Sequence, residues 1–215
     1  MERMGQKRRF LQRLALAPGG RLCYDEEKLA EAMEMYSTQV KTATLPVADW
    51  LAKYCVPAEF AEACRACPDY GKVWSCPPGV PMANTEFAPY HTAHIVAVQV
   101  IYDRATRAAA STPQETNRLR EECYGKVKRA LLDGLLAAQE ATPRSDVIAA
   151  GRCEQCDRCA RLDNLPCRKP ERRRYSFSAF GFDLTRMAGE LLGIKLLWAK
   201  NGLPEYDVAL AAFLE

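Results

Sequence analysis

Cysteines are the residues of this chain whose type and spacing point to chemistry. There are ten of them, and eight fall between residues 55 and 76 or between 153 and 167. Cys23 and Cys123 stand alone and are expected to be buried small hydrophobes. The basic stretch over residues 1–20 has too broken an apolar part for a signal peptide, and we expect an amphipathic surface helix there. Without a secretion signal, clustered cysteines indicate metal binding or redox chemistry rather than disulfides.

The second cysteine group has the more specific spacing. Cys153, Cys156 and Cys159 are separated by two residues each, and Cys167 follows. Two short spacers let one tight loop direct three thiolates at a common centre, and a remote cysteine completes the set that a cubane cluster requires. Zinc usually takes two cysteines from each of two knuckles, which leaves the middle cysteine without a role, but zinc stays open as an alternative. We therefore predict a 4Fe–4S cluster on these four residues.

The first cysteine group is less specific. Cys64 and Cys67 form a C-x2-C pair, and Cys76 follows them with two prolines directly behind it. These three can ligate a second cluster, whereas Pro57–Ala63 is expected to form a helical turn that points Cys55 away from them. A zinc knuckle and a C-x2-C redox pair remain alternatives. Cross-pairing between the two groups also stays open, because the remote cysteine of one motif can ligate the other cluster.

Three motifs in a fixed order carry a family resemblance. They are CRACPDYGKVWSCPP, then GRCEQCDRCA with PCRKPERRRYS, and then LLWAKNGLPEYDVALAAFL. This ordered set resembles an uncharacterised prokaryotic family of predicted metal-binding proteins, from about Cys64 to the C-terminus. The resemblance implies that both cysteine groups hold metal, and it supplies no reaction. The family usually has an acidic residue where this chain has Ser178, so an acid–base role is not expected at that position.

Positive charge is concentrated directly behind the second cysteine group. Cations near an anionic cluster raise its reduction potential and also suit an acidic docking partner, while a solvated basic face is an equally simple interpretation. Nucleic-acid binding is not expected, because stacking aromatics beyond Tyr175 are not interleaved with the charges. The basic residues are Arg168, Lys169, Arg172, Arg173 and Arg174.

Two histidines stand three residues apart, at His91 and His94. Both could reach one metal ion only if the segment were helical. Because no carboxylate or cysteine lies close to them in the sequence, we expect ordinary packing rather than ligation.

Helical and strand patterns alternate along the chain without a regular βαβ rhythm. Helices are predicted over residues 25–36, 113–140 and 184–191, the second behind a capping box at Thr112 and the third ended by Gly193. Strands are predicted over 38–47, 95–102, 145–150, 194–198 and 207–214, with the last two joined across Asn201 and Gly202. A short helix is an equal alternative for 207–214. The strand over 95–102 is almost wholly apolar and is expected near the centre of the sheet.

These elements predict one α+β domain over residues 1–215, with a mixed β-sheet, flanking helices and cysteine-rich metal-binding loops at about 55–81 and 151–170. Both loops are rich in Pro, Gly and Cys, a composition typical of wrapped loops rather than of long helices. No apolar run approaches the roughly 20 residues of a membrane-spanning helix, so a cytoplasmic protein is expected.

The functional hypothesis is an iron–sulfur protein with two 4Fe–4S clusters that transfers electrons or senses redox state, together with a redox partner protein. One alternative is an enzyme whose incompletely ligated cluster activates a small substrate. The other is a zinc-binding structural or interaction module. Whether the chain is an enzyme is left open by the sequence.

Overall fold

Four antiparallel strands form one sheet in the computed structural model, which describes residues 35–199 and 202–215. The strand order is β1-β2-β4-β3, so β2 and β4 are central. The strands are β1 (Tyr36–Pro46), β2 (Thr92–Tyr102), β3 (Asp146–Ala149) and β4 (Tyr206–Leu214). All three ladders are antiparallel, and a single isolated parallel bridge joins Ala149 to Ser176. The expected α+β class is confirmed, and the expected mixture of strand directions is confined to that bridge.

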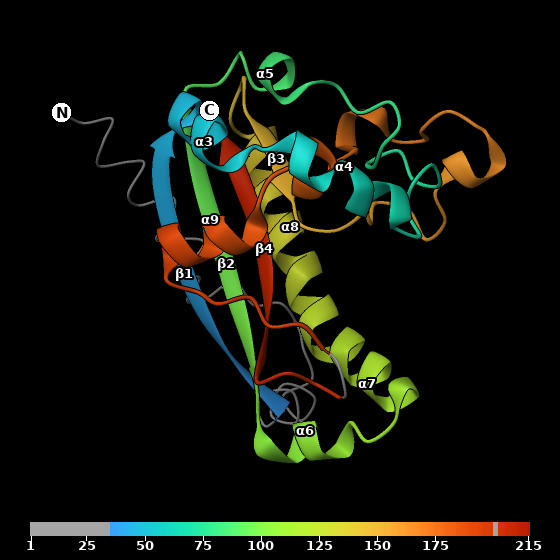
Figure 1. Ribbon diagram of the computed structural model, residues 1–215. Coiled ribbons are helices and arrows are strands. Elements are labelled where there is room, and N and C mark those ends of the chain that lie inside the picture. The colour runs from blue at the N-terminus through green and yellow to red at the C-terminus, as the bar shows by residue number, and fades with distance from the viewer. Residues whose placement is uncertain (1–34, 200–201) are drawn as a thin grey trace.

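Helices lie on both faces of this sheet (Figure 1). None of those in the described part of the chain is long and apolar enough to cross a membrane. They are α3 (Val47–Tyr54), α4 (Pro57–Ala66), α5 (Ala83–Glu86), α6 (Arg104–Ala109), α7 (Pro113–Arg120), α8 (Lys126–Glu140) and α9 (Leu184–Leu192).

The alternation of β4 explains the layers. Leu210, Ala212 and Leu214 pack with α3 and α9 in one core cluster, whereas Ala211 and Phe213 pack with α8 in another. Successive side chains of a strand point to opposite faces, so an unbroken apolar run is buried only when both faces are covered. The near-continuous apolar sequence of β4 thus matches helices on both sides.

Trp50 of α3 is the centre of the larger core. Its side chain is fully buried, its ring stacks on Phe182 at a centroid distance of 4.2 Å, and its indole Nε1 donates to the sulfur of Met187. Phe87 and Phe177 pack against the same ring. We call the strands with α3, α8 and α9 the sheet body.

The helix predicted over 113–140 is confirmed as α7 and α8, joined by a π-helical turn at Glu121–Gly125. The capping box is present, with Thr112 accepting from the Glu115 backbone N–H and Glu115 accepting from Thr112. Helix α9 begins after the Asp183 cap and ends at Gly193 in the left-handed region, as predicted.

Two predictions need correction. Residues 194–198 do not form a strand: Ile194 is buried against the larger core, but Trp198 is 71% exposed and no ladder includes the segment. The segment over 55–81 is not wholly a loop, because Pro57 starts α4 at its first turn and Cys64 lies on that helix. The predicted helix over 1–20 and residues 25–34 of the helix predicted over 25–36 lie outside the described residues, but Tyr36 begins β1 and does not end that helix.

Candidate metal centre

The two cysteine-bearing segments, residues 57–81 and 151–170, lie side by side beyond one end of the sheet, at the right of Figure 1. We call them together the cysteine lobe. Ser75 is fully buried between them. Its hydroxyl accepts from the backbone N–H of Cys153 at 2.9 Å and lies 3.8 Å from the Cys76 sulfur. Its carbonyl accepts from the Ser176 N–H at 3.2 Å. One serine thus connects both cysteine groups.

Arg161 is the second connection. Its guanidinium donates to the carbonyl oxygens of Val73, Cys76 and Pro78 at 2.9, 2.8 and 2.7 Å. The same group lies over the Trp74 ring, 4.7 Å from its centroid. Arg161 belongs to the second loop and donates to three carbonyl oxygens of the first loop. These charge-assisted hydrogen bonds fix the position of one loop relative to the other.

Trp74 of the first loop donates to the second loop, since its indole N–H lies 3.0 Å from the Leu165 carbonyl oxygen. Neither Ser75 nor Arg161 was among the candidates from the sequence. Ser75 precedes Cys76 within the family-like segment WSCPP, and this position is the signal that could have identified it.

Tight turns bring the first cysteine group together. Cys64 is on the last turn of α4, and Cys67 follows as the helix cap, with its N–H donating to the Cys64 carbonyl. Gly71, at φ +72°, folds the chain back so that its N–H reaches the Pro77 carbonyl beside Cys76. Burial raises the pKa of the Cys76 thiol; the Ser75 hydrogen bond lowers it, and the charges of nearby Asp69, Cys67 and Cys64 raise it further. The three thiols are thus electrostatic neighbours.

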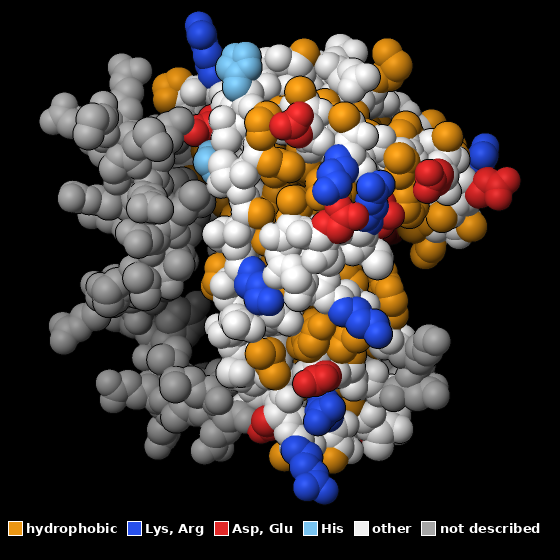
Figure 2. All heavy atoms as spheres, turned by 60° about the vertical axis from the view of Figure 1, so that its left-hand side comes forward, with side chains coloured by type: hydrophobic (Ala, Val, Ile, Leu, Met, Phe, Trp, Pro, Cys, Tyr) orange, Lys and Arg blue, Asp and Glu red, His pale blue; other side chains and the backbone are white. Residues whose placement is uncertain are grey.

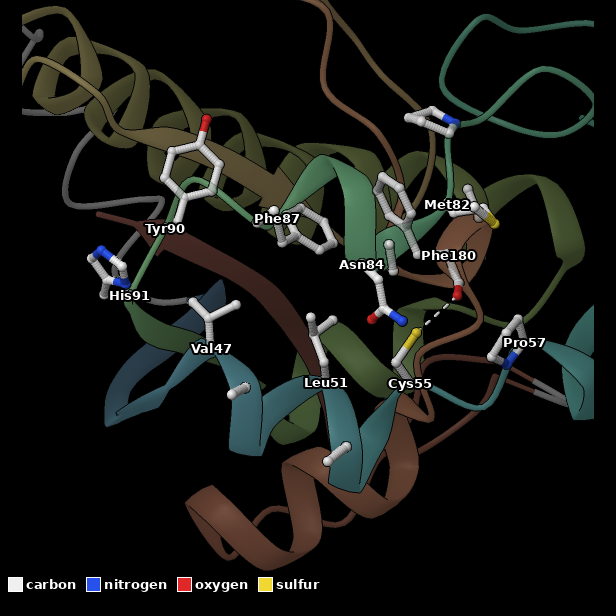
Figure 3. A pocket seen from close by; sticks show the side chains of 16 residues that line it. Val47, Leu51, Cys55, Pro57, Met82, Asn84, Phe87, Tyr90, His91 and Phe180 are labelled. Carbon is white, nitrogen blue, oxygen red and sulfur yellow. Dashed lines mark hydrogen bonds between the residues drawn. The ribbon is translucent and has the colours of Figure 1, made fainter.

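Two thiols meet the same short 3₁₀ turn, Phe177–Phe180. Cys64 donates to the Ser178 carbonyl at 3.3 Å, and Cys55 donates to the Phe180 carbonyl at 3.1 Å. Figure 3 shows the Cys55 thiol directed at Phe180, on the wall of a largely apolar cavity of about 890 Å³. Whether Cys55 also ligates metal stays a prediction, because Cys55 and Cys64 donate to carbonyls of the same turn.

The second cysteine group lies on irregular chain, as predicted, with one 3₁₀ turn at Ala160–Asp163. Its four thiols are all partly exposed, and Cys159 caps that turn. The loop is tied to the sheet body by Lys128 of α8, whose ammonium lies 2.6 Å from the Glu154 carboxylate. The four are Cys153, Cys156, Cys159 and Cys167.

The basic segment behind Cys167 is not a uniform solvated face. Lys169 donates to the Gln155 carbonyl and Arg172 to the Gln155 side chain, so both hold the second loop. Arg172 also pairs with Glu140 at the end of α8, at 2.8 Å. Arg174 is only 7% exposed. On the face in Figure 2, basic and acidic side chains are interspersed among hydrophobic ones.

The two histidines lie in different surroundings. His94 lies in β2, where its Nδ1 is 3.0 Å from the Thr44 hydroxyl and its Nε2 is 3.2 Å from a Glu215 carboxylate oxygen. The segment is extended rather than helical, and His91 instead lines the large cavity.

The donor set is chemically suited to a thiolate-bound metal. It offers seven cysteines from two hydrogen-bonded loops, and thiolate is the ligand of both iron–sulfur clusters and structural zinc. Over residues 35–199 and 202–215, no three Cys, His, Asp or Glu side chains are gathered into a metal-binding group. The structure therefore places the candidate ligands in one lobe without arranging them around a centre.

Comparison with known proteins also indicates metal binding. A family model described as "Predicted metal-binding protein (DUF2284)" matches residues 38–211, which include both cysteine groups and all four strands except the ends of β1 and β4. Searches of the curated proteins and of the solved structures found no match. The match extends over most of the chain, and this protein therefore belongs to the DUF2284 family of predicted metal-binding proteins.

Proposed function

We propose that this metal-binding protein carries 4Fe–4S clusters and acts in electron transfer or redox sensing. The first would be held by Cys64, Cys67 and Cys76, the second by Cys153, Cys156, Cys159 and Cys167. The observation that carries the proposal is the Ser75 link, which joins two thiol-rich loops into a single lobe. Seven thiols exceed the four that one tetrahedral zinc site takes, and three of them come from a single short loop.

The surroundings of the second group suit a redox centre. A cluster bound by four thiolates is anionic, and cations nearby favour its reduced form. Arg174 is buried close enough to Cys153 for their charges to interact, and Lys169 and Arg172 hold the same loop. The four cysteines of the second group are partly exposed and Cys67 of the first group is exposed, which would let a partner protein approach the bound cofactor closely.

Anaerobic reconstitution tests the proposal. Protein loaded with iron and sulfide should turn brown and contain iron and acid-labile sulfide in amounts that require both groups. Cys156→Ser should remove the cluster of the second group. Cys123→Ser is the matched control, because Cys123 is fully buried in the π-helical turn before α8, outside both cysteine loops, so its replacement should leave the iron content unchanged. Zinc alone, with no acid-labile sulfide after reconstitution, would overturn the proposal in favour of a structural zinc module.

A specific observation favours one second candidate, an enzyme that uses an incompletely ligated cluster. The Cys55 thiol is directed at the Phe180 carbonyl and a cavity of about 890 Å³, which leaves the first group with three cysteines. An iron without a cysteine ligand supplies Lewis-acid chemistry to a bound substrate. Adding cyanide to the reduced protein should then change its electron paramagnetic resonance spectrum. An unchanged spectrum would favour electron transfer.

A further inference from the structure

A second cavity, of about 240 Å³, has mostly polar walls. It is formed where the segment after the second loop passes between α5, the end of α8 and β3. Its polar walls come from residues far apart in the sequence, and no cysteine lines it. They are Glu86, Tyr90, Gln139, Ser145, Asp146, Glu171, Arg173, Arg174 and Tyr175.

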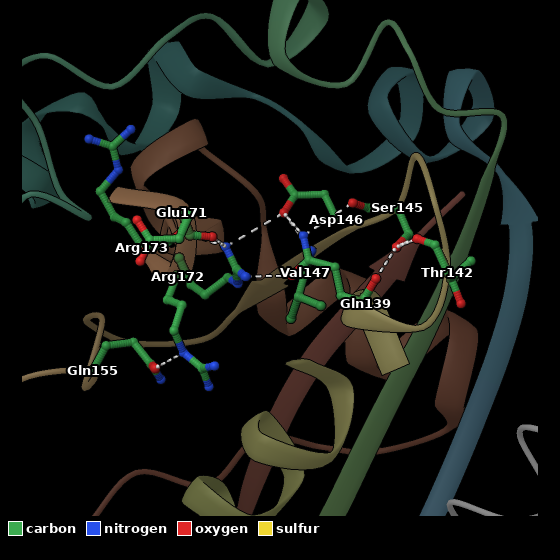
Figure 4. A network of polar contacts seen from close by, with 10 residues as sticks. Gln139, Thr142, Ser145, Asp146, Val147, Gln155, Glu171, Arg172 and Arg173 are labelled. Atoms are coloured by element: carbon green, nitrogen blue, oxygen red, sulfur yellow. Dashed lines mark hydrogen bonds and ion pairs between the residues drawn. The ribbon is translucent and has the colours of Figure 1, made fainter. Parts of the chain in front are cut away.

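Arg174 is the most buried charge on this cavity, at 7% exposure. Figure 4 shows the polar network of this region, with Gln139, Asp146 and Arg173 labelled. Its guanidinium donates to the Arg173 carbonyl at 2.8 Å and to Gln139, and it forms an ion pair with Asp146 at 3.9 Å. Within the described chain its Nε is buried without a hydrogen-bond partner. A buried donor without a partner costs free energy, and this Nε is covered by protein atoms rather than open to the cavity.

Arg173 adds a positive charge to the wall of this cavity, and Glu86 adds a carboxyl group. The Arg173 guanidinium lies over the Tyr175 ring, 4.6 Å from its centroid, and its Nε too is buried without a partner among the described residues. Burial raises the pKa of the Glu86 carboxyl, Asp146 adds to this and Arg173 opposes it. The two side chains line the same cavity and feel each other's charge, yet they form no ion pair within residues 35–199 and 202–215.

We propose that this cavity binds a small zwitterion of the α-amino acid class. The ligand carboxylate would pair with the guanidinium charges of Arg173 and Arg174, and its ammonium would donate to Glu86. A simple anion fits less well because it would meet the Glu86 and Asp146 carboxylates, and a simple cation would meet two guanidinium groups. The volume corresponds to about eight waters at roughly 30 Å³ each, which suits a small amino acid.

Calorimetry on the full chain, as purified, tests this with glycine and L-alanine as probes. Acetate and ethylamine are the matched controls, since each presents only one of the two charges. Glycine or alanine should bind at least about tenfold more tightly than either control, the effect of losing one charged hydrogen bond. The measurement does not depend on the metal content and so is independent of the cluster proposal.

Two variants locate the site. Arg173→Gln and Glu86→Gln should each weaken glycine binding by about tenfold or more. Arg168→Gln and Glu205→Gln are controls at exposed positions outside the cavity, and they should bind glycine as the parent does. Circular dichroism establishes that each variant is folded. Absence of glycine and alanine binding, acetate binding as tight as that of glycine, or unchanged binding in Arg173→Gln would each overturn the proposal.

Discussion

In the sheet body, Trp50 is enclosed by Phe87, Phe177 and Phe182, whereas α4 in the cysteine lobe has no buried residue. The lobe is instead held by polar contacts from Ser75 and Arg161. Hydrophobic burial contributes most of the stability of a folded domain, and individual hydrogen bonds contribute little net free energy. The difference indicates that the body folds on its own core, while the lobe depends on a few contacts and, under our proposal, on its metal–thiolate bonds.

The largest effect is expected from the centre of the body. Trp50→Ala should lower the free energy of unfolding by about 3–5 kcal/mol, because it empties a fully enclosed site. Trp198→Ala is the matched control: that side chain is 71% exposed and should change the stability by less than about 0.5 kcal/mol. Urea denaturation followed by circular dichroism measures both. Equal effects would mean that Trp50 does not anchor the core.

A buried thiol outside both cysteine loops gives the next effect. Cys123 is fully enclosed, and burial raises its pKa from its usual value near 9 to about 11. The unfolded chain therefore ionises this thiol first, so stability is intact below pH 9 and falls between pH 9 and pH 11. The free energy of unfolding should fall by about 2–3 kcal/mol in total, because each pKa unit corresponds to roughly 1.4 kcal/mol. Urea titrations across that range should show this decline, and Cys123→Ala should flatten it; a decline of the same slope in the variant would assign it to other groups.

A smaller and local effect is expected in the lobe. Arg161→Gln removes three hydrogen bonds to the first loop and the contact with Trp74. The free energy of local opening over residues 73–78, measured by amide hydrogen exchange, should fall by about 1–3 kcal/mol. Exchange in β2 and β4 should stay as in the parent.

Arg158→Gln is the control for this variant. Arg158 is exposed and pairs only within its own loop, with Asp163 at 2.5 Å, so exchange over 73–78 should not change. If β2 and β4 exchanged faster in Arg161→Gln, the separation between body and lobe would be wrong.

The smallest effect concerns Cys55, which lies at the border between the two regions. Cys55→Ser should keep the full iron content of the parent after reconstitution, because its thiol is directed at the Phe180 carbonyl rather than at the other three thiols. Metal analysis should compare the iron content of Cys55→Ser with that of Cys64→Ser, which should lose one cluster. Loss of iron in Cys55→Ser would mean four cysteine ligands and would remove the basis for an open iron.

Much of the body could be predicted because its signals are local. The capping box at Thr112, the Gly193 end of α9 and the apolar run of β2 each determine structure within a few residues. The strand predicted over 194–198 was wrong because the apolar Ile194 packs into the core without pairing to another strand. In the same way, the Pro and Cys content over 55–81 concealed α4, in which Pro57 occupies the first turn where proline is favourable.

The lobe was only half predictable. Cysteine spacing identified the candidate ligands, since short spacers are a local property. The contacts that join the loops are not local: Ser75 and Cys153 are 78 residues apart, and Arg161 meets Val73 across 88. Ser75 has one local signal, its place directly before Cys76 in WSCPP, whereas nothing in the immediate sequence of Arg161 distinguishes it from other surface arginines.

The strand order sets a sequence of events for assembly. The first loop leads into β2 and the second follows β3, but these strands do not pair with each other, because β4 lies between them. Residues 206–214 thus join the two strands that adjoin the cysteine loops, and we expect Ser75 to meet Cys153 once they have entered the sheet. The ribosome makes every cysteine before it makes this strand. Under our proposal, metal delivered before residues 206–214 are synthesised would therefore find separate loops.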